Sequence, residues 1–171
     1  MTDRIVLEPL RSEHADEMVA VLRDPALYMF TGGEPPTLHE LRARYERQAV
    51  GRSPDGSAEW LNWIVRTVDD GRAIGFVQAT VVDGRADVAW LIGTQWQGRG
   101  YATEAAGRML ALLEQRCVRE ITSHIRADHA ASARVATNLG LSPTDEVEEG
   151  ELVWRLLLDG AGRIEGLEWS R

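Results

Sequence analysis

The sequence has little cysteine, no long apolar run and no excess of positive charge. Its single cysteine, Cys117, excludes an internal disulfide and a multi-cysteine metal site, and we expect a small core residue in a reducing compartment. No uncharged stretch approaches the length that spans a membrane, and the chain does not open with a basic segment followed by an apolar one. The sequence therefore predicts a cytoplasmic protein without a membrane partner.

Charge and histidine spacing exclude two further classes. The formal net charge is −8, which argues against nonspecific binding of nucleic acid and leaves room for a cationic substrate. The histidines show no paired metal-ligand spacing, so we expect surface or capping residues and no metal at His14, His39, His124 and His129. No Gly-x-Ser-x-Gly elbow is present to anchor a hydrolase triad.

Length and pattern predict one domain of mixed helices and strands. With 171 residues and 44% hydrophobic content, the chain can build one sizeable core, so we expect a single domain over residues 1–171. Ser12 is expected to cap the first helix, and Thr37 with Glu40 the second. The expected strands are 4–10, 60–68, 73–82, 86–92, 120–125, 144–148 and 151–158, and later helices are 101–116 and 130–139. Strands 60–92 form an antiparallel meander with Asp-Gly turns.

A glycine-flanked arginine marks the turn between strand 86–92 and helix 101–116, in "QWQGRGYATEA". Glycine lets the backbone approach an anion closely, and the N–H groups of residues 98–102 would converge at a positive helix N-terminus. A dinucleotide fingerprint does not fit, because Thr103 replaces its third glycine and an antiparallel meander precedes the turn. No Gly-Lys-Ser/Thr follows for a Walker loop. On Gly-x-Gly alone, an anion site and a plain connecting turn both stay open.

The turn resembles the Gln/Arg-x-x-Gly-x-Gly/Ala element of the GNAT acetyltransferase superfamily, here Gln95, Gly98 and Gly100. The order of elements is similar along nearly the whole chain, and "GRGYATEAA" and "ASARVATNLGL" are similar to the branch of ribosomal-protein N-terminal acetyltransferases. The resemblance implies a mixed α/β (α+β) fold with a mostly antiparallel, splayed sheet of about seven strands flanked by about four helices. It also implies acetyl-coenzyme A as co-substrate and transfer of its acetyl group to a primary amine.

The resemblance assigns cofactor roles position by position. The main chain near Leu91 and Ile92 would bind the pantetheine arm between diverging strands. His129 stands where the family's Asn-x-x-Ser element has asparagine, and Ser132 matches its serine. Arg99 and Arg134 reach outer phosphates or are solvated surface residues. The residues implied to grip the pyrophosphate are Gln97, Gly98, Arg99, Gly100, Tyr101 and Ala102.

The catalytic groups are less defined. Asp87, where related sequences often carry glutamate, would be the base, acting through water, or else a structural carboxylate. The family's usual acid, a tyrosine on the helix after the fifth strand, is missing from 130–139, so Ser132 or an ordered water would protonate the thiolate. A noncatalytic acyl-coenzyme A sensor or scaffold, and an enzyme with a different acyl donor, are the alternatives.

An acidic run points to the acceptor. Residues 145–151, "DEVEEGE", fall in the final hairpin, which borders the acceptor cleft in the GNAT fold. They are a solvated surface or a negative field that attracts a cationic amine. Because no strong base is visible, peptide or protein N-termini and small-molecule amines of low pKa are favoured over lysine side chains. The expected state is a monomer or a homodimer.

Overall fold

The computed structural model describes residues 3–158, so residues 159–171 of the expected single domain lie outside the described part. Seven strands form one sheet in the order β1-β2-β3-β4-β5-β7-β6, and all neighbouring pairs except β4 and β5 are antiparallel. The strands are β1 (Ile5–Pro9), β2 (Glu59–Thr67), β3 (Ala73–Val82), β4 (Arg85–Ile92), β5 (Glu120–Ile125), β6 (Ser142–Glu148) and β7 (Glu151–Leu157). The expected mixed fold with a mostly antiparallel sheet is confirmed.

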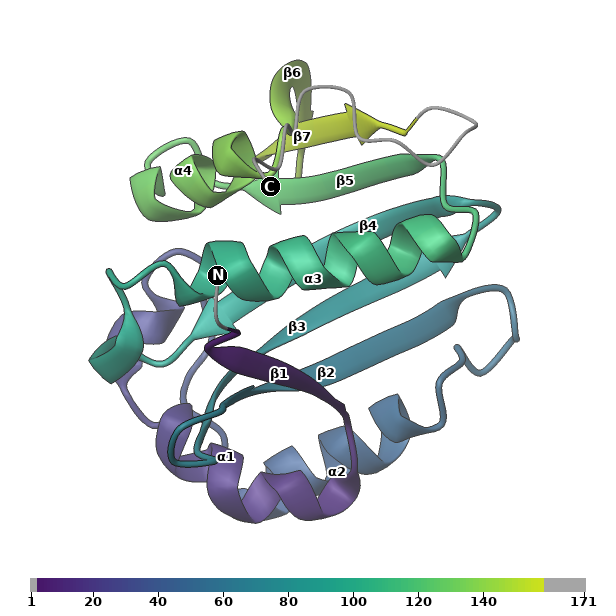
Figure 1. Ribbon diagram of the computed structural model, residues 1–171. Coiled ribbons are helices and arrows are strands. Elements are labelled where there is room, and N and C mark those ends of the chain that lie inside the picture. Colours follow the sequence, from purple (N-terminus) through teal and green to yellow (C-terminus); the bar gives the residue numbers. More distant parts are fainter. Residues whose placement is uncertain (1–2, 159–171) are drawn as a thin grey trace.

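Helices cover both faces of this sheet (Figure 1). On one face, α3 and α4 bury the larger core, which includes Ile74, Met109 and Ile121. On the other face, α1 and α2 pack over β2 and β3 around Met18 and Leu41. The helices are α1 (Ala15–Val21), α2 (Leu38–Ala49), α3 (Tyr101–Gln115) and α4 (Ala130–Asn138), with short 3-10 turns at Ser12–His14, Pro25–Tyr28 and Thr94–Trp96.

Local sequence signals hold at several turns. The Thr37 hydroxyl accepts from the Glu40 N–H and the Glu40 carboxylate accepts from the Thr37 N–H, which confirms the capping box of α2. The β3–β4 hairpin turns through Asp83 and Gly84, with φ of 49° and 76°. Positive φ at both central residues suits the twist of the flanking strands and explains the Asp-Gly step.

Other local expectations are wrong. Ser12 does not cap the first helix; it begins a 3-10 turn, and the His14 ring accepts from the Arg11 N–H at 2.9 Å instead. Cys117 is exposed rather than buried, with φ of 61° in the turn that follows α3. Of the four tryptophans that lie in strands, only Trp154 is buried. Trp63 and Trp90 are half-buried against the core, and Trp60 lines a surface pocket.

The sheet opens between β4 and β5. The backbones of these parallel strands pair only from Arg85 with Glu120 to Asp87 with Thr122. The Val88 carbonyl still accepts from the Ser123 hydroxyl of β5 at 3.0 Å, and residues 89–92 continue without a β5 partner. The turn that follows β4 leads into α3 at the open end. The divergence therefore brings the edge of β4, the glycine turn and the end of β5 to one place.

Candidate functional site

The glycine turn has the geometry of an anion cradle. Gly98 and Gly100 have φ of 75° and 81°, a region that favours glycine, and no atom lies within 4 Å of the place where a Cβ of Gly98 would stand. Within residues 3–158, the backbone N–H groups of residues 98–103 donate to no protein acceptor. The first N–H group of α3 that donates a hydrogen bond is that of Glu104, to the Gly100 carbonyl. These groups lie at the positive end of a helix of 15 residues.

Arg4 fastens the outer side of this turn. Its guanidinium donates to the Arg99 carbonyl at 2.9 Å and pairs with Glu104 at 2.7 Å. It also lies over the Tyr101 ring, 4.6 Å from the ring centre. Sequence reasoning placed Arg4 only at the start of a strand, because nothing in its spacing links it to a turn 95 residues away.

The open edge of β4 presents alternate peptide groups. The Gly93 N–H donates to the Ile74 carbonyl of β3, so alternation along the strand turns the peptide groups of Leu91 toward β3 and those of Trp90 and Ile92 toward the opening. The Ile92 carbonyl accepts from the Gln97 side chain at 2.8 Å. Of the two residues expected to line the opening with their main chain, Ile92 does so and Leu91 does not.

His129 and Ser132 meet at the start of α4. The His129 ring caps the helix by accepting from the Ser132 N–H at 3.0 Å, and its other nitrogen lies 3.4 Å from the Ser132 hydroxyl. The ring also packs against Phe30, with centres 4.0 Å apart. The His129 side chain is therefore the N-terminal cap of α4. Arg99 and Arg134 are exposed and make no ion pair among the described residues.

A charged cluster spans the opening on the face that carries α1 and α2. Asp87 is the last β4 residue paired with β5, and its carboxylate lies 3.0 Å from His124 Nδ1 and accepts from the Thr122 hydroxyl. His124 Nε2 lies 2.8 Å from Glu148 at the end of β6. Burial disfavours the charged ring, but Glu148 and Asp87 outweigh burial and raise the pKa of His124.

Sequence reasoning missed one member of this cluster. His124 was grouped with the scattered histidines, whereas Glu148 belongs to the acidic run that was expected beside the acceptor cleft. The period of two in β5 places Thr122 and His124 on one face, but only the sheet order places that face beside Asp87. Within residues 3–158, no group of three or more His, Cys, Asp or Glu residues is arranged to hold a metal ion. No helix in this part of the chain is long and apolar enough to cross a membrane.

Comparison with known families identifies this arrangement. The sequence model of the acetyltransferase (GNAT) domain matches residues 4–142. The chain belongs to the GNAT acetyltransferase family. A search of curated protein sequences found no match.

Solved GNAT structures share the fold at low sequence identity. RimL, the ribosomal L7/L12 alpha-N-protein acetyltransferase, in complex with coenzyme A, is 14% identical with a TM-score of 0.78, over 93% of this chain and 97% of that one. AAC(6')-Ib in complex with ribostamycin and coenzyme A is 17% identical with a TM-score of 0.78, over 97% and 100%. A GNAT-family acetyltransferase from Bacillus anthracis is 13% identical with a TM-score of 0.74, over 92% and 96%. At such identities the likeness concerns the fold.

Proposed function

We propose that this GNAT protein transfers the acetyl group of acetyl-coenzyme A to a primary amine. The observation that carries the proposal is the set of unbonded N–H groups at residues 98–103, beside the opening between β4 and β5. A pyrophosphate requires such converging donors, and a pantetheine arm requires a free strand edge. The solved relatives named above include complexes with coenzyme A.

The chain's own groups suit each part of this co-substrate. The amides of the glycine turn hold the pyrophosphate, with Gln97, Tyr101 and Ala102 at its borders and Arg99 and Arg134 free to meet outer phosphates. The peptide groups of Trp90 and Ile92 pair with the pantetheine arm. Acetyl-coenzyme A supplies an activated thioester, whose carbonyl oxygen gains negative charge as the amine attacks. A β4 N–H that faces the opening stabilises that charge.

Two proton transfers complete the reaction. The amine nitrogen forms a bond to the acetyl carbon and the carbon–sulfur bond breaks, giving an amide and a thiolate. Asp87, hydrogen-bonded to His124, takes the proton that the amine loses, directly or through a water. Ser132 returns a proton to the thiolate and is itself hydrogen-bonded near His129. Solvent then takes the proton from Asp87 and returns one to Ser132, so the net change is the transfer of one proton from the amine to the thiolate.

The free energy of deprotonation favours weakly basic acceptors. At pH 7, deprotonation of an amine with a pKa near 8 costs about 1.4 kcal/mol, whereas deprotonation of a lysine side chain costs about 4.6 kcal/mol, which is about 3.3 kcal/mol more. The side chain of Asp87, the proposed proton acceptor, is half-exposed, with 52% of its surface accessible to solvent. Peptide or protein N-termini and small-molecule amines of low pKa are therefore the proposed acceptors.

Turnover with a panel of amines tests the proposal. Peptide N-termini, polyamines and aminoglycosides are incubated with acetyl-coenzyme A, and the acetylated product is detected by mass. Reagents that detect the released thiol also react with exposed Cys117, so Cys117→Ser is the control protein for them. Acetylation of one class at enzymatic rates supports the proposal. Tight binding of acetyl-coenzyme A without turnover would favour a sensor, and faster turnover of a longer acyl group would change the donor.

A further inference from the structure

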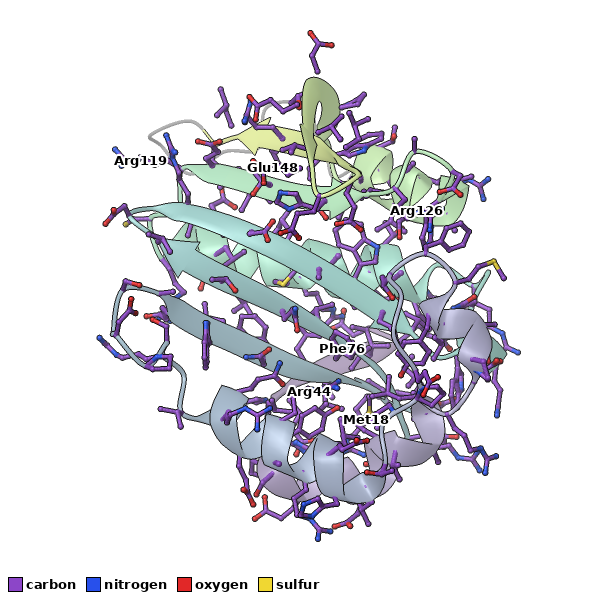
Figure 2. The ribbon with its side chains drawn as sticks, turned by 180° about the vertical axis from the view of Figure 1, so that it is seen from behind. Met18, Arg44, Phe76, Arg119, Arg126 and Glu148 are labelled. Atoms are coloured by element: carbon purple, nitrogen blue, oxygen red, sulfur yellow. The ribbon has the colours of Figure 1, made fainter. Side chains whose placement is uncertain are left out.

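A basic pocket lies between α2 and the sheet, on the same face as Asp87. It has a volume of about 230 Å³ and opens between two arginines of α2 and the polar residues of β2 and β3. Figure 2 views this face, with Arg44 toward the α2 end and Glu148 toward the β6–β7 hairpin. The residues that define this basic pocket are Arg44, Arg47, Gln48, Trp60, Asn62, Gln78, Ala79 and Thr80.

The two arginines are not neutralised. Neither Arg44 nor Arg47 has an ion-pair partner within residues 3–158, whereas Arg42 on the same helix pairs with Asp16 and Arg66 pairs with Glu8. Among residues 3–158, no carboxylate lines the basic pocket. Its other polar members include three side-chain amides and a hydroxyl, which can donate hydrogen bonds. In a protein of net charge −8, this set of positively charged and neutral donors favours an anionic group.

A buried hydroxyl adjoins the basic pocket. A smaller cavity shares Arg44, Gln48, Asn62 and Gln78 with it and is lined by Tyr45. Tyr45 is only 4% exposed, and its hydroxyl has no hydrogen-bond partner in the described part of the chain. A buried hydroxyl left unbonded is costly, so this one favours a polar ligand group that reaches the inner end of the cavity.

The sheet register sets the distance from the basic pocket to the reaction centre. Thr80 of the basic pocket pairs directly with Asp87, and Trp60 on the next strand pairs with Thr80. Neighbouring strands lie about 4.8 Å apart, so the basic pocket is one to two strand spacings, roughly 5–10 Å, from Asp87. The row from Trp60 through Thr80 to Asp87 thus joins a positive region to a negative one along one face.

We propose that the basic pocket binds a carboxylate of the acceptor while the acceptor's amine lies at Asp87. This inference rests on the proposed function and specifies its substrate: an amine with an anionic group roughly 5–10 Å away. An extended peptide advances about 3.3 Å per residue, so in a peptide the acidic side chain falls about two or three residues beyond the amino terminus. A small aminocarboxylate of that span has the same chemistry. The acidic cluster attracts the ammonium end and the arginines orient the other end.

Paired acceptors test the inference. Peptides with a serine amino terminus carry aspartate at the second, third, fourth or sixth position, each matched by a peptide with asparagine there; a small aminocarboxylate and its amide form a further pair. The chain contains no lysine, so a reagent for amines reports the acceptor and little of the enzyme. We expect the aspartate form to have a KM about tenfold lower than its partner at the third or fourth position, with no difference at the sixth.

Arginine variants locate the effect. Arg44→Gln with Arg47→Gln should raise the KM of the aspartate peptide to that of the asparagine peptide and leave the KM of acetyl-coenzyme A unchanged. Arg42→Gln, on the same helix but outside the basic pocket, should preserve the difference. If the KM difference between acid and amide is larger for the small aminocarboxylate than for any peptide pair, the carboxylate recognised by the basic pocket belongs to a small molecule. Equal KM values within every pair, for the unaltered protein, would overturn the inference.

A binding measurement separates this inference from the proposed function. If no amine is acetylated, the proposed function fails, and calorimetry with N-acetylated aspartate and asparagine peptides still tests the basic pocket. Preferential binding of the aspartate form that disappears in the Arg44→Gln, Arg47→Gln variant supports the basic pocket. Equal binding of both forms, or a preference that survives in that variant, contradicts it. Circular dichroism of each variant checks that it is folded.

Discussion

His124 Nε2 lies 2.8 Å from a carboxylate oxygen of Glu148, which ties the last hairpin to the inner strand β5. The hairpin turns through Glu149 and Gly150, with φ of 51° and 85°, so Glu148 is held at the end of its strand. Because His124 also contacts Asp87, the hairpin and the proposed base belong to one hydrogen-bonded chain. Substitutions at Glu148 or His124 should therefore alter the position of the Asp87 carboxylate.

Replacing His124 should lower stability most at acidic pH. The pKa of His124 is raised in the folded protein, so its charged form contributes stability that is fully present below the unfolded value of about 6.5. That contribution is lost as the pH rises through the higher folded value. Urea unfolding of the unaltered protein and of His124→Gln should give a free-energy difference that is largest near pH 5.5 and smaller near pH 9. A difference of the same size at both pH values would contradict the ion cluster.

Asp87→Asn should lower kcat by about 10²-fold or more near pH 7, because it removes the proposed proton acceptor. Affinity for coenzyme A should stay within about threefold, since the group acts on the amine rather than on the co-substrate. The defect should shrink at higher pH, where more of the acceptor is already neutral. Thr122→Val, which removes a hydrogen bond to Asp87, is the milder companion variant. Full activity of Asp87→Asn at pH 7 would leave Asp87 a structural carboxylate.

Ser132→Ala should reduce kcat while leaving most coenzyme A affinity intact, as expected of a group that acts mainly in the transition state. The His129 cap accepts from the Ser132 backbone, so the helix start should survive this change. Steady-state rates with saturating acetyl-coenzyme A, together with calorimetry, measure the two effects. Unchanged kcat would assign proton return to water.

Gly98→Val should abolish most coenzyme A binding. Gly56 is a matched control, because both glycines have φ of 75° and neither has an atom within 4 Å of an added Cβ. A left-handed conformation costs a residue with a Cβ about 1–2 kcal/mol, so Gly98→Val and Gly56→Val should lose similar stability. Only the Gly98 variant should lose affinity in calorimetry. Equal coenzyme A affinity in both folded variants would exclude close approach of phosphate to this turn.

Arg4→Gln should weaken coenzyme A binding several-fold without direct contact, because Arg4 holds the Arg99 carbonyl and Glu104 in place. The KM of acetyl-coenzyme A should rise while the acceptor's KM stays the same, a split that general destabilisation does not produce. Arg108→Gln removes another side chain that pairs with Glu104. This variant tests whether the loss of a contact to Glu104, without loss of the contact to the Arg99 carbonyl, is enough to weaken coenzyme A binding. A uniform loss of activity and stability would make Arg4 a purely structural residue.

The fold was predictable because its signals are local. Caps and turns are each specified within a few residues, by Thr37 with Glu40, Asp83 with Gly84, and Gly98 with Gly100. The order of these elements along the chain is what made the sequence resemble the GNAT fold. The glycine turn was found for the same reason. Cys117 was misplaced because small size suggests burial, whereas the left-handed turn after α3 places it on the surface.

The contacts on the acceptor side were not predictable, because they join residues far apart in the sequence. Asp87 and His124 are 37 positions apart and meet only through the parallel pairing of β4 with β5. The basic pocket is formed by residues of α2, β2 and β3. The sequence "LRARYERQA" of α2 alone predicts only a helix with a solvent-exposed charged face. The direction of the Leu91 peptide group depends on which backbone groups of β4 pair with β3, and the sequence pattern of a strand does not contain this information.

The short pairing between β4 and β5 divides the sheet into a four-stranded and a three-stranded half, joined there by only three residue pairs. A ligand that pairs with the free edge of β4 would add contacts between the two halves of the sheet. It would thereby increase the cooperativity with which the two halves unfold. Hydrogen exchange at the ends of β4 and β5 should therefore slow when coenzyme A is added, with smaller changes in β1 and β2. Two fragments made by cutting the chain in the loop between α3 and β5 should reassemble more readily when the ligand is present. The boundary between β4 and β5 is therefore a suitable place to split the protein into a reporter of acyl-donor concentration.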